Sequence, residues 1–253
     1  MRFASLGSGS RGNATLVEAG PTIIMVDCGF SIAETERRLA RLHTLAADIS
    51  AILVTHEHSD HVSGVARFAR RHSIPVWCTA GTLAACTKPG LDEVHIIDGR
   101  DAFSIGDLGI TPVTVPHDAR EPVQFVFSDG GSRFGLLTDT GSITPHILKL
   151  FDACAALMLE CNHDRRMLED SAYPATLKAR VGGPLGHLSN AQAAEFLREL
   201  DQSRLQYVAA AHLSEKNNTP ALAQAALADA AGCELDWIAV VDQEQGLNWC
   251  ALA

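Results

Sequence analysis

Residues 55–61 read THEHSDH and directly follow an apolar, strand-like run. This density of imidazole and carboxylate groups predicts a metal site, because Zn(II), Mn(II) and Fe(II) take such ligands. His56 and His58 are two positions apart, so an extended backbone directs both rings to the same side. Asp60 and His61 fall at the start of the following helical pattern. Four candidate ligands therefore come from six consecutive residues.

A single ion does not accommodate this cluster well. A catalytic metal needs an open position for water, and four ligands so close in sequence cannot all reach one ion comfortably. The cluster therefore predicts a second ion, with further ligands from elsewhere in the chain. Other apolar runs also end on potential ligands, at His117, Asp139, His163 and His212. If these strand ends meet at one rim of the fold, they complete both coordination shells.

The periodicity of the chain predicts a layered α/β (α+β) fold. Apolar runs rich in β-branched residues predict strands at 14–19, 22–27, 51–56, 110–117, 123–128, 133–139, 156–161, 207–212 and 237–242. Helical patterns cover 31–43, 60–72, 144–151, 189–200 and 219–232. The expected N-caps are Ser31, Ser189 and Thr219, with Glu34 and Gln192 completing capping boxes. We expect a four-layer αββα sandwich of two mixed β-sheets flanked by helices, with a doubly wound sheet as the main competitor.

Bulk composition limits the function classes. The chain has 253 residues and 47% hydrophobic content, which suits a single domain over 1–253. A formal charge of −10 argues against a broad basic surface for nucleic acid, so any phosphate recognition must be local. Seven cysteines without a CxxC pair predict reduced thiols. No run approaches the ~18 apolar residues of a membrane helix, so we expect no membrane association and a cytoplasmic protein.

The motifs together resemble the metallo-β-lactamase fold superfamily, whose members mostly bind two metals. The chain is similar to the YycJ (WalJ) group of bacterial metallohydrolases in LGSGSRGN (6–13), THEHSDHVSGV, PHDAREPV (116–123), LTDTG, ECNHD (160–164), GHLSN (186–190) and HLSEKNN (212–218). The resemblance implies that one ion binds His56, His58 and His117. It implies that the other binds Asp60, His61 and His212, with Asp139 bridging both. The two divalent ions would be zinc or manganese, with iron also possible.

The resemblance also suggests residues that act on the substrate. His187 in GHLSN resembles an extra active-site histidine of ribonuclease Z-like phosphodiesterases, which contacts the scissile phosphate or protonates the leaving oxygen. The alternative for His187 is a capping or core histidine. We place Asp60 and His187 in the catalytic set. Candidate substrate contacts are Ser10, Asn13, Asn162, His163 and Arg166.

Two features depart from related sequences. Gln124 stands where the pattern of the group predicts glycine, which puts the close approach of that segment to its neighbours in doubt. The interval between Asp139 and His212 leaves no room for a β-CASP-type insertion, the long insertion of nucleases that process RNA ends.

The resemblance implies a phosphodiesterase that acts on nucleic acid ends, as a 5'-to-3' DNA exonuclease. One alternative is hydrolysis of a lactone, thioester or small cyclic phosphodiester, because the same activated hydroxide attacks carbonyl carbon or phosphorus. A second alternative is a non-catalytic accessory protein with a structural metal. The open ligand pattern weighs against it, since structural zinc sites are closed by four protein ligands.

Overall fold

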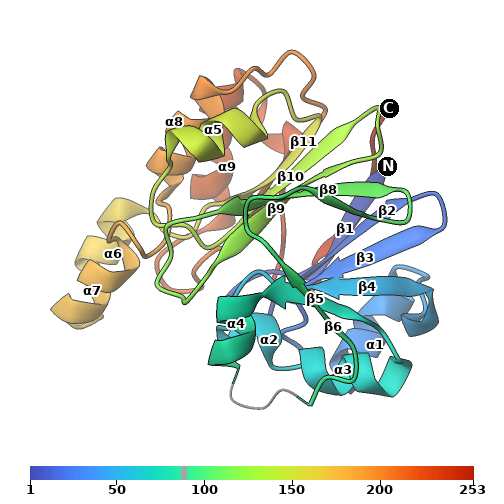
Figure 1. The fold of residues 1–253 in the computed structure, drawn as a ribbon. Helices are drawn as coiled ribbons and strands as arrows, with labels where there is room; N and C mark the ends of the chain where they lie inside the picture. Colours follow the sequence, from blue (N-terminus) through green and yellow to red (C-terminus); the bar gives the residue numbers. More distant parts are fainter. Residues whose placement is uncertain (87–89) are drawn as a thin grey trace. The chain divides into compact units, whose positions relative to one another are not determined.

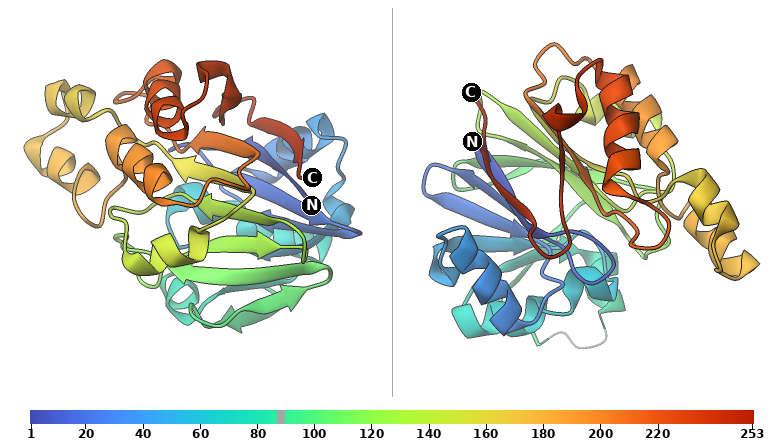
Figure 2. Two further views of the ribbon diagram at one scale, coloured as in Figure 1. Left: turned by 90° about the horizontal axis from the view of Figure 1, so that it is seen from above. Right: turned by 180° about the vertical axis from the view of Figure 1, so that it is seen from behind.

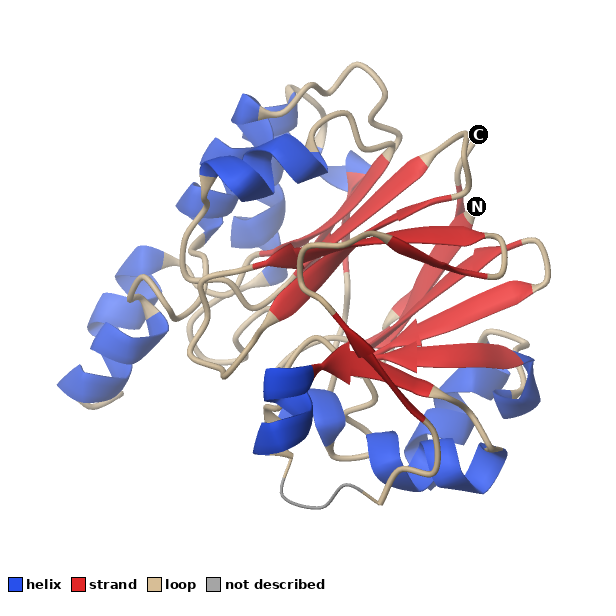
Figure 3. Cartoon of the chain, in the orientation of Figure 1, coloured by secondary structure: helices blue, strands red, loops and turns tan. Residues whose placement is uncertain are grey.

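The computed structural model describes residues 1–86 and 90–253, which form two mixed β-sheets flanked by helices (Figures 1 and 3). The predicted fold class is confirmed. The chain divides into two compact units. Unit 1 comprises residues 1–114, 119–132 and 242–253, and unit 2 comprises 115–118 and 133–241. The expectation of one domain over 1–253 stays a prediction.

The first sheet lies within unit 1 and has the order β14-β1-β2-β3-β4-β5-β6. Its strands are β14 (Leu247–Ala251), β1 (Arg2–Gly7), β2 (Ala14–Ala19), β3 (Thr22–Val26), β4 (Ile49–Leu53), β5 (Val76–Thr79) and β6 (Val94–Ile97). The pairs from β14 to β3 are antiparallel, and those from β3 to β6 are parallel. Pairing of β1 with β14 brings the two termini together (Figure 2). Unit 1 also contains the antiparallel strands β7 (Phe103–Ile105), β8 (Leu108–Thr114) and β9 (Val123–Ser128).

Helices cover one face of the first sheet (Figure 1). They are α1 (Ile32–Arg41), α2 (Ser59–Val62), α3 (Val65–His72) and α4 (Ala80–Ala85), with a 3-10 turn at Ala46–Asp48. Leu39 of α1 and Phe68 of α3 are buried against Leu16, Met25 and Ile52 of the sheet. Burying such side chains contributes about 1.5–3 kcal/mol each, so this amphipathic packing holds the helices in place.

The structure divides the helix predicted at 60–72 into α2 and α3. Gly64 lies at the break, and its N–H donates to the carbonyl oxygen of Cys28 at 2.8 Å. A Cβ placed on Gly64 would lie 2.0 Å from the carbonyl oxygen of Phe30. The close crossing of these two backbone segments therefore interrupts the helix, which no local pattern reveals.

We expect Gly64→Ala to lower the free energy of unfolding by about 1–3 kcal/mol, because the new methyl group meets backbone that cannot move alone. Gly109→Ala is the matched control, since a Cβ there lies 3.6 Å from its nearest neighbour. Urea unfolding of both variants measures the difference. Equal stability of the two would show that the Gly64 crossing relaxes freely.

Unit 2 contains the parallel strands β10 (Arg133–Leu137), β11 (Ala156–Glu160), β12 (Tyr207–Ala211) and β13 (Ile238–Val240). Helices α5 (Pro145–Phe151), α8 (Asn190–Glu199) and α9 (Pro220–Ala231) lie on one face of these strands (Figure 1). A 3-10 turn at Leu235–Trp237 precedes β13. Helices α6 (Arg165–Asp170) and α7 (Ala175–Val181) extend away from the strands. Every residue of β11 is buried, as expected for a central parallel strand.

Several local predictions are confirmed. Ser31, Ser189 and Thr219 each accept a hydrogen bond from a backbone N–H of the first helical turn. Ser189 and Gln192 form the complete capping box. The capping box predicted with Glu34 is wrong, because its carboxylate accepts hydrogen bonds from Arg37 and Arg38 instead of the Ser31 N–H.

Gln124 is fully buried in β9, opposite Val113 of β8. All seven cysteines are free. Among residues 1–86 and 90–253, no helix combines the length and apolar character needed to cross a bilayer.

Candidate metal centre

In unit 1 the candidate ligands follow the ends of two parallel strands. Strands β3 and β4 are paired in parallel, with Val26 opposite Leu53. Parallel strands end at the same edge of a sheet, so Asp27 after β3 lies beside the segment that carries His56 and His61. The N–H of Asp27 donates to the carbonyl oxygen of Leu53 at 2.7 Å, which fixes this edge.

The buried carboxylate of Asp27 organises the HEHSDH segment. It accepts hydrogen bonds from the Thr55 N–H and hydroxyl, both at 2.8 Å, and from His61 Nδ1 at 2.8 Å. Because the Thr55 proton goes to Asp27, the hydroxyl oxygen accepts from His56 Nδ1 at 2.9 Å. Both rings are then protonated at Nδ1. Their Nε2 atoms carry the lone pairs that a metal requires.

We expect Asp27→Asn to reduce metal affinity by about 10- to 100-fold, because an amide cannot accept all three hydrogen bonds that orient His56 and His61. Competition with a metal-sensitive dye measures the affinity. Asp101→Asn is the control, since Asp101 is an exposed residue of the same unit. Unchanged affinity in Asp27→Asn would show that the rings keep their orientation without the carboxylate.

The LGSGSRGN segment reaches the same cluster through Asn13. Its amide nitrogen Nδ2 lies 3.2 Å from Asp60 Oδ2 and 3.2 Å from His61 Nε2. Its Oδ1 accepts from the Gly9 N–H at 2.8 Å and from the Ser8 hydroxyl at 3.0 Å. Asn13 is buried and holds two candidate ligands in place, in addition to its predicted role beside the substrate.

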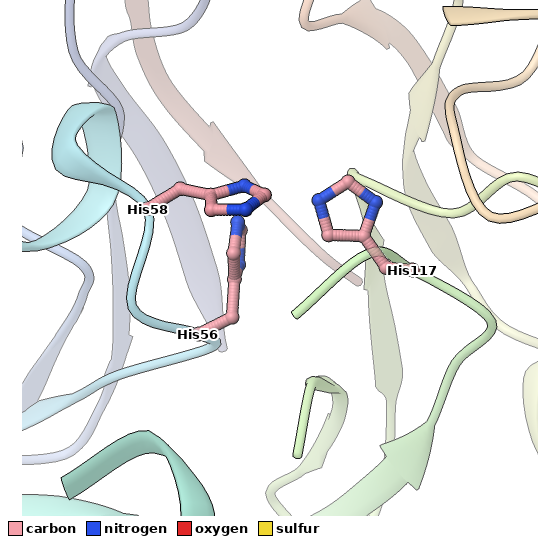
Figure 4. Close-up of side chains that lie close together, drawn as sticks. All are labelled: His56, His58 and His117. Carbon is pink, nitrogen blue, oxygen red and sulfur yellow. The ribbon is translucent and has the colours of Figure 1, made fainter. Parts of the chain in front are cut away.

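The histidines of this segment are close neighbours. The rings of His56 and His58 lie edge to face (Figure 4). Their centroids are 4.6 Å apart. The rings of His56 and His61 are 4.2 Å apart. Asp60 Oδ2 lies 3.4 Å from His61 Nε2. The structure therefore places these four side chains close to one another, and their role as metal ligands stays a prediction.

In unit 2 a second group of candidate ligands follows parallel strands. Asp139 comes two residues after β10, Glu160 ends β11 and His212 follows β12. The register pairs Glu160 with Ala211, so these side chains gather at one edge. Ligand atoms of Asp139, Glu160, His187 and His212 all lie within 4.8 Å of one another.

Three residues that lie just after strand ends, Asp27, Asp139 and His212, have left-handed backbone conformations. The φ angles are 60° for Asp27, 56° for Asp139 and 55° for His212. This region is disfavoured for residues with a side chain, although Asp and His tolerate it better than most. Such strain persists where surrounding contacts determine the conformation, and it concentrates at functional sites.

Glu160 is the central acceptor of unit 2. Its fully buried carboxylate accepts from His187 Nδ1 at 2.7 Å and from His212 Nδ1 at 3.2 Å through Oε1. Its other oxygen accepts from the N–H groups of Thr140 at 3.0 Å and Leu188 at 3.1 Å. A buried charge is tolerated when it is paired and hydrogen-bonded in this way. The carboxylate thus fixes the orientation of two histidines at once.

Electrostatics makes Glu160 and His187 an ion pair. Burial alone would raise the pKa of Glu160, but the His187 charge and the hydrogen bonds from His187 and His212 lower it to about 2. Burial alone would lower the pKa of His187, but the charge and hydrogen bond of Glu160, with Asp139, outweigh it and raise that pKa. With Nδ1 directed at Glu160, the His187 Nε2 proton is available to another group.

His117 completes the set in unit 2. Its Nδ1 donates to the carbonyl oxygen of Gly186 at 3.0 Å, and its Nε2 lies 4.0 Å from Asp139 Oδ1. His212 Nδ1 lies 3.3 Å from the same Asp139 oxygen. In both rings an acceptor therefore selects Nδ1 for the proton. Nε2 then carries the lone pair, so it is the atom that can bind a divalent metal.

The remaining predicted residues occupy different environments. Asn162 is buried and donates to the carbonyl oxygen of His212 at 3.1 Å, so it holds the backbone of that candidate ligand in place. His163 is buried and lines a separate cavity. Arg166 is exposed, with its Nε 3.7 Å from Asp170. Ser10 is exposed on the turn after β1. Contact of these residues with a substrate stays a prediction.

The sequence analysis missed two residues of the site, Asp27 and Glu160. Each is an acid that ends an apolar run, and Glu160 in ALMLEC stands out because a glutamate in a buried strand needs a partner. That signal could have identified Glu160. An aspartate after a strand is commonplace, so Asp27 had no comparable signal.

Comparisons with known proteins agree with this geometry. The model of the β-lactamase superfamily domain matches residues 22–208. Exodeoxyribonuclease YycJ of Bacillus anthracis is 32% identical over 88% of this chain and 86% of its own. The chain belongs to the metallo-β-lactamase superfamily. Within that superfamily it belongs to the YycJ/WalJ family, since exodeoxyribonuclease WalJ of Streptococcus pneumoniae is also 32% identical over 88% of this chain and 85% of its own.

Solved structures of other proteins share the fold. The metallo-β-lactamase fold protein YhfI from Bacillus subtilis has a TM-score of 0.76 and 14% identity, and the match covers 99% of each chain. Human tRNase Z, short form, has a TM-score of 0.69 and 15% identity, with each chain fully covered. The protein is a hydrolase of the metallo-β-lactamase superfamily with a candidate metal-binding cluster of His, Asp and Glu residues.

Proposed function

We propose that the protein is a dinuclear metal-dependent phosphodiesterase that degrades DNA from 5' ends. One observation carries the proposal. Buried acceptors direct the Nδ1 protons of four candidate histidines and leave each Nε2 for a metal. They are Asp27 for His61, Thr55 for His56, Gly186 for His117 and Glu160 for His212. Such acceptors are typical partners of metal-binding histidines.

In this proposal His56, His58 and His117 would hold one ion, and Asp60, His61 and His212 would hold the other. Asp139 would be shared between them. Two divalent ions, zinc or manganese, would acidify a water toward pKa ~7 and supply the attacking hydroxide at neutral pH. The set would leave room for water, because each ion would have three unshared protein ligands and one shared carboxylate.

The chain itself supplies a proton to the leaving group. Glu160 holds His187 through Nδ1, which leaves the Nε2 proton for the oxygen that departs from phosphorus. Donation to this oxygen contributes about 10²- to 10⁴-fold in general acid catalysis. Asp60 acts by ligating metal, and Asn13 orients it.

The choice of DNA as substrate is supported by the curated relatives, which are named exodeoxyribonucleases and match 88% of the chain. The net charge of −10 is compatible with an enzyme that binds the end of a DNA strand through metal ions and a few local hydrogen-bond donors. Free thiols in all seven cysteines support a reducing, cytoplasmic location.

The test is degradation of a DNA duplex that carries a 5' phosphate and a 3'-end label, with Mn(II) or Zn(II). Digestion from 5' ends produces a ladder of progressively shorter labelled strands. The same duplex labelled at the 5' end should release labelled mononucleotide at once. Chelation with EDTA should stop both reactions.

Two outcomes would contradict the proposal. Turnover of a lactone or thioester, without shortening of DNA, would indicate the small-ester hydrolase. A metal-loaded protein that is inert on phosphodiesters, lactones and thioesters would indicate the non-catalytic accessory protein.

A further inference from the structure

A cavity of about 360 Å³ in unit 2 lies outside the candidate metal ligands. Its wall comes from the segment after β11, from α6 and α7, and from the first turn of α8. The lining residues that bear on its chemistry are His163, Arg165, Glu169, Lys178, Gly182 and Gln192. The volume falls within the ~300–1,000 Å³ range of small-molecule sites.

His163 is the buried polar group of this wall. The residue has a relative exposure of 2%, and its Nδ1 has no hydrogen-bond partner among the residues that the structure describes. Nε2 faces Gly182, 3.8 Å from the position that a Cβ there would take. A proton on Nδ1 would be a buried donor without an acceptor, which is rare in folded proteins. The proton of the neutral His163 ring therefore belongs on Nε2. That nitrogen is then a donor at the cavity wall.

Two cations share the wall. Arg165 Nε donates to the Ser189 hydroxyl at 3.3 Å, and Lys178 Nζ donates to the carbonyl oxygen of Glu169 at 2.6 Å. Both partners are neutral, so these hydrogen bonds fix the side chains without cancelling their charges. By contrast, Arg180 nearby in sequence is paired with Asp118 at 2.6 Å. The Glu169 carboxylate is the acid of the wall, which leaves a net positive cavity.

The chain connects this cavity closely to Glu160 and His187. His163 follows Glu160 by three residues at the end of β11. On the other side, α7 ends at Val181, whose carbonyl oxygen accepts from the His187 N–H at 2.8 Å. A group bound in the cavity therefore lies beside the pair that we propose as proton donor.

We propose that this cavity binds a phosphate group of the substrate strand, with Arg165, Lys178 and His163 as donors. Arginine and lysine are the usual ligands of phosphate, and a local cationic site suits a chain of net charge −10. The inference rests on the proposed function, since it adds a second phosphate contact to the same substrate. The bound group is either the 5'-terminal phosphate or an internal phosphodiester.

The test is binding of fluorescein-labelled, phosphorothioate-linked DNA, which resists cleavage, to the full metal-loaded chain. Arg165→Gln and Lys178→Gln should each raise Kd about tenfold, as expected for loss of one charged contact. Arg204→Gln is the matched control. It removes the same charge from an exposed side chain of the same unit that does not line this cavity, and should change Kd less than about twofold. Glu169→Gln should lower Kd, because it removes the acid from the wall.

Comparison of 5'-phosphorylated and 5'-hydroxyl DNA identifies the bound group. If the 5'-hydroxyl strand binds as weakly as the Arg165 variant binds phosphorylated DNA, the cavity holds the terminal phosphate. If both strands bind wild type equally and the variants weaken both, it holds an internal phosphate. Equal effects of Arg165→Gln and Arg204→Gln would overturn the proposal, because they would indicate unspecific attraction.

A small substrate separates this inference from the proposed function. Bis(p-nitrophenyl) phosphate has one phosphate and cannot fill both positions, so the cavity variants should cleave it at the wild-type rate. Lost cleavage in these variants would show a structural defect and overturn the inference. A wild-type protein that degrades no DNA but shows the binding pattern would refute the exonuclease and leave the phosphate site standing.

Discussion

Asp139→Ala is expected to abolish phosphodiester cleavage, with a loss of about 10³-fold or more in kcat. The carboxylate lies 3.3 Å from His212 Nδ1 and 4.0 Å from His117 Nε2, and we propose that it bridges both ions. Without it, each ion would lose a proposed ligand and would be held less tightly. The measurements are the rate on end-labelled DNA and the metal content by mass spectrometry.

Asp236→Ala is the control for Asp139→Ala, since Asp236 is an exposed aspartate of the same unit. Circular dichroism of both variants should match wild type, which separates a lost site from a lost fold. Full nuclease activity in Asp139→Ala would exclude Asp139 from the centre and refute the proposed ligand assignment.

His187→Ala is expected to lower kcat on DNA by about 10²- to 10⁴-fold, the usual contribution of a general acid. The reason is the hydrogen bond from Nδ1 to Glu160, which leaves the Nε2 proton for the leaving oxygen. The effect should depend on the leaving group. A nucleoside alkoxide needs the proton, whereas p-nitrophenolate departs without it, so bis(p-nitrophenyl) phosphate should be cleaved at nearly the wild-type rate.

Two further results would test the assignment of His187 as the proton donor. Glu160→Gln should impair the same step and also destabilise the protein by about 2–5 kcal/mol, because an amide cannot accept all four hydrogen bonds of the buried carboxylate. An equal loss on both substrates in His187→Ala would show that His187 positions the phosphate rather than donating a proton.

The pH dependence should follow the pKa of His187. Glu160 raises this pKa, so the protonated donor persists above the usual range of histidine. Activity that needs the donor is therefore present at low pH and is lost as pH rises through the raised pKa. In Glu160→Gln the loss should begin at lower pH, which a kcat profile on DNA would reveal.

Much of the fold could be predicted because its signals are local. Strand β2 and strand β9 have the predicted bounds, and Ser189 caps α8 with Gln192 as expected. Strands β1 and β14 were missed because short, Gly- or polar-containing segments owe their pairing to each other across the whole chain. The break at Gly64 was missed because its cause is the backbone of Phe30, more than thirty residues earlier.

The local sequence determines which side chains of this protein are candidate metal ligands. His56 and His58 share a side because of the two-residue period of an extended chain, and no distant contact is needed for that. Only the tertiary structure decides which nitrogen of each ring is offered to a metal. For His61 and His212 the acceptors that select it come from far along the chain, 34 residues away for Asp27 and 52 for Glu160. Thr55 is next to His56 in sequence, but its hydroxyl accepts from that ring because its own proton goes to Asp27, 28 residues earlier. Hydrogen-bond partners at such separations are set by strand order, because parallel strands bring their ends to one edge.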